Sequence, residues 1–185
     1  MVDVGALFDG NASQIAATAK AQGAAARGYV PEGEEGFSGV SDAKEAYDCS
    51  RDLPEDDPDY LAGNPLLGPN QWPALPGFSD AVNAYYDATF ELGRALLRGF
   101  ALALDQPADR FDAVLTKPPS QLRLIHYAHD HYAHDPQATD RPGIGAHTDY
   151  EMFTLLRSTA PGLDRPAGAA RRSDCDARNA IKTLS

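Results

Sequence analysis

The clearest pattern along the chain is a helical repeat of largely apolar positions between residues 79 and 104. The repeat has intervals of three and four, which place side chains on one face of an α-helix. Its members are Val82, Tyr85, Thr89, Leu92, Leu96, Phe100 and Ala103. Ser79 is a typical N-cap, and Asp80 supplies an acidic first turn. We therefore predict a helix over 80–104, about 37 Å long at ~1.5 Å per residue, with its aromatic stripe in the core.

Alternation of apolar and polar positions predicts three strands in the second half of the chain. They cover residues 121–127, 143–150 and 152–157, and the turn signal Pro161-Gly162 follows the last of them. A short helix is expected over 111–115, ended by Pro118-Pro119. The pattern is thus a long helix followed by a group of strands.

Two segments lack a regular pattern. Residues 28–76 are rich in Gly, Pro and Asp, which is typical of loops, and the acidic run 52–59 within them is expected to be solvated. Tyr60 and Trp72 favour ordered loops packed on a folded body, because disordered segments are usually poor in aromatic residues. After Leu163 the alternation stops, so we expect residues 164–185 to form a divergent, disordered tail.

Composition narrows the class of protein. The 185 residues, 43% of them hydrophobic, are enough for one globular domain. A formal net charge of −11 disfavours nucleic acid and anionic membranes as partners. Two distant cysteines form no disulfide framework, and the start of the chain has no basic leader or long apolar run. We therefore expect a cytoplasmic protein whose partners are small molecules, a metal or another protein.

The stretch Gly145-Ala146-His147-Thr148-Asp149-Tyr150 carries the most specific chemistry. Residues i and i+2 of a strand point to the same side, so His147 and Asp149 can converge on one point. An imidazole and a carboxylate suit a divalent first-row metal, and a second histidine would complete the triad that leaves positions open on iron(II). No histidine follows His147 in the sequence.

A second group of histidines lies upstream, at positions 126, 129, 131 and 134, beside Asp130 and Asp135. Their spacing matches no closed zinc pattern, and the simplest interpretation is a solvated loop. Such imidazoles could still bind nickel, copper or zinc adventitiously. A histidine of this loop could also replace the missing third ligand if the loop folded back onto the strand.

Several blocks together resemble the isopenicillin N synthase-like branch of the iron(II)- and 2-oxoglutarate-dependent dioxygenases. They are Arg27–Pro31, Asp42–Asp48, Gly68–Pro73, Leu122–Tyr127, Gly145–Tyr150, and Phe153–Leu156 before Pro161-Gly162-Leu163. The resemblance implies an α+β fold, mainly β with helices. It would be a partial double-stranded β-helix, or jelly roll, with a long packing helix. Residues 27–163 would form the dioxygenase-like domain, preceded by a shortened N-terminal segment over 1–26.

The resemblance also implies a site. Iron(II) would be held by His147 and Asp149, with 2-oxoglutarate as co-substrate and molecular oxygen as oxidant. Tyr127 matches a tyrosine that contacts the co-substrate in many members. Arg123 alternates to the same face and could also bind a carboxylate, although a solvent-facing arginine is the simpler interpretation. Arg172-Ser173 does not match the family's co-substrate anchor, because its spacing and surroundings differ.

The third ligand and the family's Arg-x-Ser anchor are missing from the pattern, so the resemblance implies a C-terminally truncated member. Two hypotheses follow. The first is an oxidoreductase of the iron(II)- and 2-oxoglutarate-dependent class that acts on a small molecule and is inactive in this truncated form. The alternative is a non-catalytic remnant with loose metal or protein binding.

Overall fold

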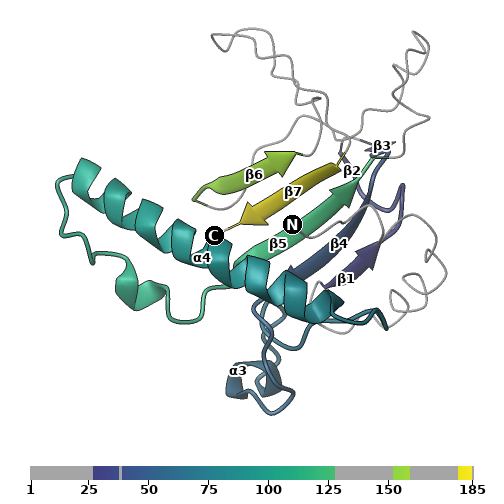
Figure 1. Cartoon of the computed structure of the whole chain (residues 1–185), viewed down its shortest axis with the longest axis horizontal. Coiled ribbons are helices and arrows are strands. Elements are labelled where there is room, and N and C mark those ends of the chain that lie inside the picture. The colour runs from purple at the N-terminus through teal and green to yellow at the C-terminus, as the bar shows by residue number, and fades with distance from the viewer. Residues whose placement is uncertain (1–26, 38, 128–151, 159–178, 185) are drawn as a thin grey trace, which may run out of the picture.

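A five-stranded antiparallel sheet crossed by one long helix makes up the described fold (Figure 1). The computed structural model describes residues 27–37, 39–127, 152–158 and 179–184. Its elements are β1 (Gly28–Val30), β2 (Gly36–Phe37), β3 (Val40–Ser41), β4 (Glu45–Ser50), α3 (Pro58–Leu61), α4 (Phe78–Ala103), η1 (Asp112–Val114), β5 (Gln121–His126), β6 (Thr154–Ser158) and β7 (Asn179–Leu184). The large sheet has the order β1-β4-β5-β7-β6, and β2 and β3 form a separate hairpin.

The long helix is confirmed as α4, but its N-cap and its buried face differ from the prediction. The N-cap is Gly77, whose φ of 75° suits glycine, and Ser79 lies inside the first turn. The buried positions are Phe78, Val82, Tyr86, Gly93, Leu97 and Ala101. Leu92 and Phe100 of the predicted stripe are 51% and 44% exposed. Apolar residues occur on both sides of this helix, so spacing alone did not identify the side that packs.

The core between α4 and the sheet is aromatic. Phe78 of α4 meets Tyr47 of β4 edge to face, with ring centroids 5.7 Å apart, and Trp72 lies 6.0 Å from the same phenylalanine. Leu122 and Leu124 of β5 and Tyr29 of β1 belong to the same cluster. The prediction that the Trp72 loop packs on a folded body is therefore confirmed.

Leu122→Ala should destabilise the fold by about 2–5 kcal/mol, because Leu122 is fully buried and its removal leaves a cavity against α4. The measurement is urea unfolding followed by far-UV circular dichroism. The matched control is Leu92→Ala, the same substitution at an exposed position, for which we expect a change within about 0.5 kcal/mol. Equal losses in the two variants would contradict this assignment of the core.

Residues 28–76, predicted as loops, contain the strands β1 and β4, so that part of the prediction is wrong. The strand β4 was missed because its polar residues point to both sides of the sheet rather than alternating with apolar ones. Glu45 pairs with His126 and Asp48 pairs with Arg123 in the register between β4 and β5. Hydrogen bonds to Arg123 and His126 within the fold accommodate the carboxylates of Asp48 and Glu45.

Most of the acidic residues of the run 52–59 are exposed, as predicted, but specific contacts also order the loop. Asp52 accepts hydrogen bonds from the backbone of Asn70 and from Nε1 of Trp72, both at 2.8 Å. Asp57 caps α3, and Lys117 donates to it at 2.6 and 2.7 Å. These contacts attach the loop before α4 to the sheet and to the segment that leads into β5.

The final strand, β7, corrects the prediction of a disordered tail for residues 179–184. It lies between β5 and β6 and pairs antiparallel with both. A strand inside a sheet must pair its backbone groups on both edges, and β5 meets this need through β4 on one side and β7 on the other. The strand β7 is recognised by its backbone pairing with β5 and β6. Such pairing between distant segments is not visible in the alternation of side chains along the sequence.

The other predicted elements have mixed outcomes. The strand predicted over 121–127 is confirmed as β5, and the one over 152–157 is confirmed as β6 with a small shift. The helix predicted over 111–115 is only the single 3-10 turn η1. The predicted strand over 143–150 and the short helix over 11–26 lie outside the described residues. The α+β class is confirmed at the level of an antiparallel sheet with a packing helix.

Candidate active site

The two faces of the β4–β5 pair have different chemistry. Side chains that alternate toward α4 form the aromatic core described above. We call the opposite side the distal face; it carries Ala46 and Asp48 of β4, Arg123 and Ile125 of β5, and Tyr127. Figure 1 shows α4 crossing only one side of the sheet, so the distal face lies away from the helix.

Tyr127, the predicted co-substrate contact, lies on the distal face directly after the end of β5. It is buried and packs with Ala46 and Ile125, with Val30 of β1 at the edge of the cluster. Alternation along β5 puts it on the same side as Arg123, as the sequence indicated. The structure thus places Tyr127 and Arg123 on one face, with Ile125 between them.

Arg123 is a carboxylate partner rather than the solvent-facing arginine that we preferred. Its Nε and Nη2 donate to the two oxygens of Asp48, each at 2.6 Å, and its Nη1 and Nη2 donate to Glu35 at 2.9 and 2.8 Å. Burial acts to lower the pKa of Arg123, but hydrogen bonds and charge from Asp48 and Glu35 outweigh it and raise that pKa. The guanidinium of Arg123 therefore donates its hydrogen bonds to the carboxylates of Asp48 and Glu35 within the protein.

Lys44 extends this arrangement into a buried charge network. Its ammonium lies 3.1 Å from Glu35 and also donates to Asp42. Lys44 and Asp42 are 5% and 6% exposed, so these charges are almost fully removed from water. Buried charges persist when they are paired and hydrogen-bonded, as they are here. The network gives the distal face a rigid polar part beside the apolar cluster around Tyr127.

Glu35→Gln should lower the free energy of unfolding at pH 7 by about 1–3 kcal/mol, because the charged hydrogen bonds from Arg123 and Lys44 are weakened. Burial acts to raise the pKa of Glu35, but Arg123 and Lys44 outweigh it and the net pKa is lowered. The carboxylate then stabilises the fold above its unfolded pKa, near 4.5, and this contribution is lost as the pH falls through the folded value.

Urea unfolding of both proteins between pH 7 and 3 measures this dependence. The wild-type advantage over Glu35→Gln should be full above about pH 5 and shrink below the ordinary pKa of a glutamate. An advantage that stays constant down to pH 3 would show that Glu35 is not held by these cations.

A second cluster, formed by Tyr29, Glu45 and His126, lies on the α4 side of the same strands. Nδ1 of His126 donates to Glu45 at 2.7 Å, and the Tyr29 hydroxyl donates to the other oxygen of that carboxylate. Burial acts to raise the pKa of Glu45, but hydrogen bonds from His126 and Tyr29 outweigh it and lower the pKa. We call these three residues the Glu45 cluster.

The Glu45 cluster bears on the hypothesis that a histidine of the upstream group replaces the missing third metal ligand. His126 alternates to the side opposite Tyr127, and its Nδ1 is bound to Glu45. It is therefore not a ligand on the distal face. The other candidate residues all lie outside the described residues: the upstream histidines His129, His131 and His134, and the predicted metal pair His147 and Asp149. Within the described ranges, no group of three or more His, Cys, Asp or Glu side chains is arranged to hold a metal.

Sequence reasoning missed Glu45, Asp48 and Glu35 as members of these clusters. A signal was present in the antiparallel register. If Asp48 is placed opposite Arg123, the same register places Glu45 opposite His126, so one alignment of the two segments yields two complementary pairs. Glu35 lies in the loop before β2, and its contact with Arg123 could not be read from the sequence.

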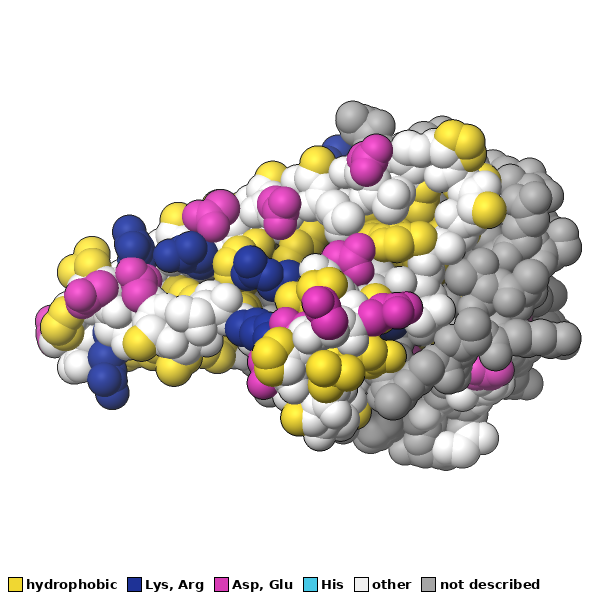
Figure 2. All heavy atoms as spheres, turned by 90° about the horizontal axis from the view of Figure 1, so that it is seen from below, with side chains coloured by type: hydrophobic (Ala, Val, Ile, Leu, Met, Phe, Trp, Pro, Cys, Tyr) yellow, Lys and Arg dark blue, Asp and Glu magenta, His cyan; other side chains and the backbone are white. Residues whose placement is uncertain are grey.

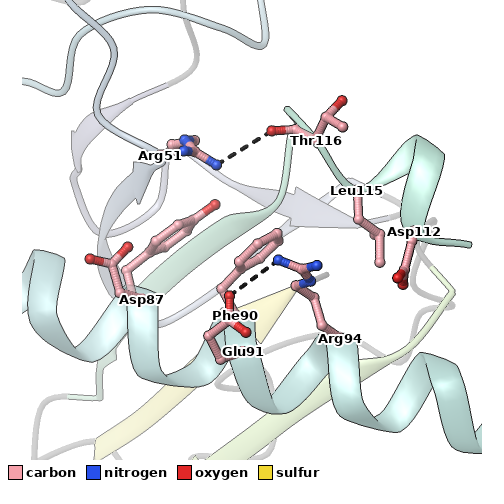
Figure 3. Close-up of a pocket in the computed structure, with 9 residues that line it drawn as sticks. Arg51, Asp87, Phe90, Glu91, Arg94, Asp112, Leu115 and Thr116 are labelled. Atoms are coloured by element: carbon pink, nitrogen blue, oxygen red, sulfur yellow. Dashed lines mark hydrogen bonds and ion pairs between the residues drawn. The ribbon is translucent and has the colours of Figure 1, made fainter. Parts of the chain in front are cut away.

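A groove of about 340 Å³ lies between α4 and residues 112–116 (Figure 3). Phe90 and Leu115 supply its apolar part, and Arg51 and Arg94 also line it. Arg94 pairs with Glu91 at 3.4 Å, and Arg51 donates to the carbonyl of Thr116 at 3.5 Å. Figure 2 shows acidic and basic side chains interspersed over this side of the molecule. The groove therefore has no single charge that would select a ligand.

None of the described helices is both long enough and apolar enough to cross a membrane. The longest of them, α4, carries charged residues along its length, including Glu91, Arg94 and Arg98.

Comparison with known proteins identifies relatives of one kind. Residues 6–75 match the family model described as the N-terminal part of non-haem dioxygenases in morphine synthesis. The chain is 37% identical over 132 residues to the homoarginine-6-hydroxylase 2-ODD-233 of Oryza sativa subsp. japonica, covering 70% of this chain and 40% of that protein. It is 35% identical over 136 residues to the 2-oxoglutarate-Fe(II) type oxidoreductase hxnY of Emericella nidulans, covering 68% and 38%.

Solved structures agree. A 2OG-Fe(II) oxygenase family protein from Caulobacter crescentus matches 98% of this chain and 57% of its own, with a TM-score of 0.68 and 27% identity. A full-length Neurospora crassa protein, solved in complex with alpha-KG, matches 98% and 56%, with a TM-score of 0.68 and 26% identity. The chain spans about two fifths of the length of the curated relatives that it matches. It belongs to the iron(II)- and 2-oxoglutarate-dependent dioxygenase family.

Proposed function

We propose that this chain carries part of the active site of an iron(II)- and 2-oxoglutarate-dependent dioxygenase that oxidises a small molecule with molecular oxygen. The observation that supports it most is the distal face of β4 and β5, which presents Tyr127 and a rigid ion network on the side of the sheet away from α4. Relatives named for iron(II) and 2-oxoglutarate support the cofactor assignment. The full jelly roll belongs to the same proposal, and so does a dioxygenase-like domain that includes β7 (Asn179–Leu184) in addition to the expected residues 27–163.

His147 and Asp149 are proposed as the iron ligands. A neutral imidazole nitrogen and a carboxylate oxygen are donors that suit iron(II), so the donor set fits the metal in kind. The pair lies in sequence between Tyr127 and Thr154, the first residue of β6, so both of its flanking segments belong to the described sheet. Bound iron(II) and 2-oxoglutarate would supply the oxidising chemistry.

Residues on the distal face have proposed roles around that centre. The Tyr127 hydroxyl would donate a hydrogen bond to the co-substrate, and Ile125 and Ala46 would exclude water from beside it. Arg123 would not bind the co-substrate, because its guanidinium is occupied by Asp48 and Glu35. Its role would be to hold β4, β5 and the loop containing Glu35 in place.

Oxygen-dependent conversion of 2-oxoglutarate to succinate tests the function. The purified chain is supplied with iron(II), ascorbate and 2-oxoglutarate, first alone and then with small amino acids, including homoarginine because relatives are named for it. Succinate formation that rises with one of these compounds supports the proposal. No succinate from folded protein that binds neither iron(II) nor 2-oxoglutarate would overturn it in favour of a non-catalytic remnant.

A further inference from the structure

The Glu45 cluster joins three strands at one end of the sheet. Glu45 opens β4, His126 closes β5, and Tyr29 is the middle residue of β1. The register places Glu45 directly opposite His126, so their contact runs straight across the strand pair. Each oxygen of the carboxylate accepts one hydrogen bond, from Tyr29 on one side and from His126 on the other.

The cluster is shielded from water, which makes its hydrogen bonds effective. Tyr29 is 8% exposed, and the side chains of His126 and Glu45 are 19% and 22% exposed. Burial and the neighbouring carboxylate of Glu45 raise the pKa of Tyr29, so its hydroxyl keeps its proton and donates. Charge-assisted hydrogen bonds of this kind are stronger than neutral ones and fix geometry.

His126 and Tyr127 are adjacent in the chain and point to opposite faces of the sheet. Restraint of the His126 side chain on the α4 side therefore restrains the peptide from which Tyr127 projects on the distal face. The contact between Glu45 and His126 adds a side-chain restraint to the backbone pairing at this end of β4 and β5. Supporting contacts behind a functional group commonly fix its orientation in this way.

We propose that Glu45 is a positioning residue for the 2-oxoglutarate site, acting through His126 on Tyr127. The proposal rests on the proposed function, because it assigns the positioned side chain to the co-substrate. It requires no contact between Glu45 and any ligand. The proposal predicts that the affinity for 2-oxoglutarate depends on Glu45 and that the affinity for iron(II) does not.

Three variants of the full chain test it: Glu45→Ala, Glu45→Gln and Tyr127→Phe. Anaerobic equilibrium titrations measure the Kd of iron(II) and, with iron(II) present, that of 2-oxoglutarate. Glu45→Ala should weaken 2-oxoglutarate binding by about tenfold and leave the iron(II) Kd within about twofold. Glu45→Gln keeps an acceptor for His126 and should restore most of the affinity. Tyr127→Phe should reproduce the Ala effect without altering the Glu45 cluster.

Amide hydrogen exchange measures, without any ligand, whether Glu45 restrains the backbone around Tyr127. In Glu45→Ala, protection of the Ile125, His126 and Tyr127 amides should fall by about tenfold or more, whereas exchange in α4 stays unchanged. Glu91→Ala is the matched control, since Glu91 is an exposed glutamate of α4 that pairs only with Arg94 among the described residues. It should change neither exchange nor binding.

The outcomes separate the two claims. Unchanged 2-oxoglutarate affinity in Glu45→Ala, or parallel loss of iron(II) and 2-oxoglutarate binding, would overturn the positioning role. Wild-type protein that binds no 2-oxoglutarate would overturn the proposed function, and with it the assignment of Tyr127. In that event, unchanged amide hydrogen exchange at Ile125, His126 and Tyr127 in Glu45→Ala would also exclude the proposed restraint of the end of β5 by Glu45.

Discussion

Arg123→Met should lower the free energy of unfolding by about 3–5 kcal/mol, because it removes one partner of a buried ion pair. Asp48, 4% exposed, would lose the two hydrogen bonds at 2.6 Å that now offset its burial, so its carboxylate would be buried unpaired or take up a proton, and either change costs free energy. Glu35 would lose its bidentate partner at the same time. Guanidinium chloride unfolding at pH 7, followed by tryptophan fluorescence from Trp72, measures the loss.

Two further variants separate pairing from simple loss of packing. The double variant Asp48→Leu with Arg123→Met should recover much of the loss, because an apolar pair of similar size leaves no unpaired charge at these two positions. Arg98→Met, which removes an exposed arginine paired with Asp112, should have little effect. The damage from Arg123→Met should also shrink at acid pH, because burial raises the pKa of Asp48 and a protonated carboxyl is less costly to bury. A loss below about 1 kcal/mol would contradict the buried network.

His147→Ala should weaken iron(II) binding by about 100-fold or more, since even outer contacts of a metal site commonly contribute 10–100-fold. The matched control is His129→Ala, a histidine of the upstream group. If His147 and Asp149 are the ligands, His129→Ala binds iron(II) as the wild type does. The reverse result, in which metal binding survives loss of His147 but not of His129, would instead favour loose binding by the histidine-rich segment. Competition with a coloured iron(II) chelator measures both affinities.

Local pattern predicted the elements that pack in a simple way. The spacing of α4 and the alternation of β5 were sufficient, because each buries a largely apolar side against the other. The buried face of α4 was predicted wrongly because the partly exposed Leu92 and Phe100 are as apolar as the residues that are buried. Which side of such a helix is covered depends on the sheet, and the sheet is assembled from segments far apart in the sequence.

In the candidate site, too, some residues could be predicted from local sequence and others depend on how distant strands pair. Tyr127 could be placed because it is the last residue of the strand predicted over 121–127, and the structure puts it on the face shared with Arg123. The partners of Arg123 and His126 depend on the register of β4 against β5, and β4 did not resemble a strand because Glu45 and Asp48 interrupt it. Polar residues in a strand look exposed until their partners are known. The metal pair itself lies outside the described residues.

Anaerobic titration of the purified chain with iron(II) and 2-oxoglutarate tests the central claim most directly. Chelation of iron(II) by the co-substrate in a protein site gives a weak visible charge-transfer band. We expect a saturable band with one equivalent of each component, absent in His147→Ala and shifted to higher 2-oxoglutarate concentration in Tyr127→Phe. Folded wild-type protein that gives no band, or a band that persists in His147→Ala, would contradict the assignment of this chain as an iron(II)- and 2-oxoglutarate-binding site.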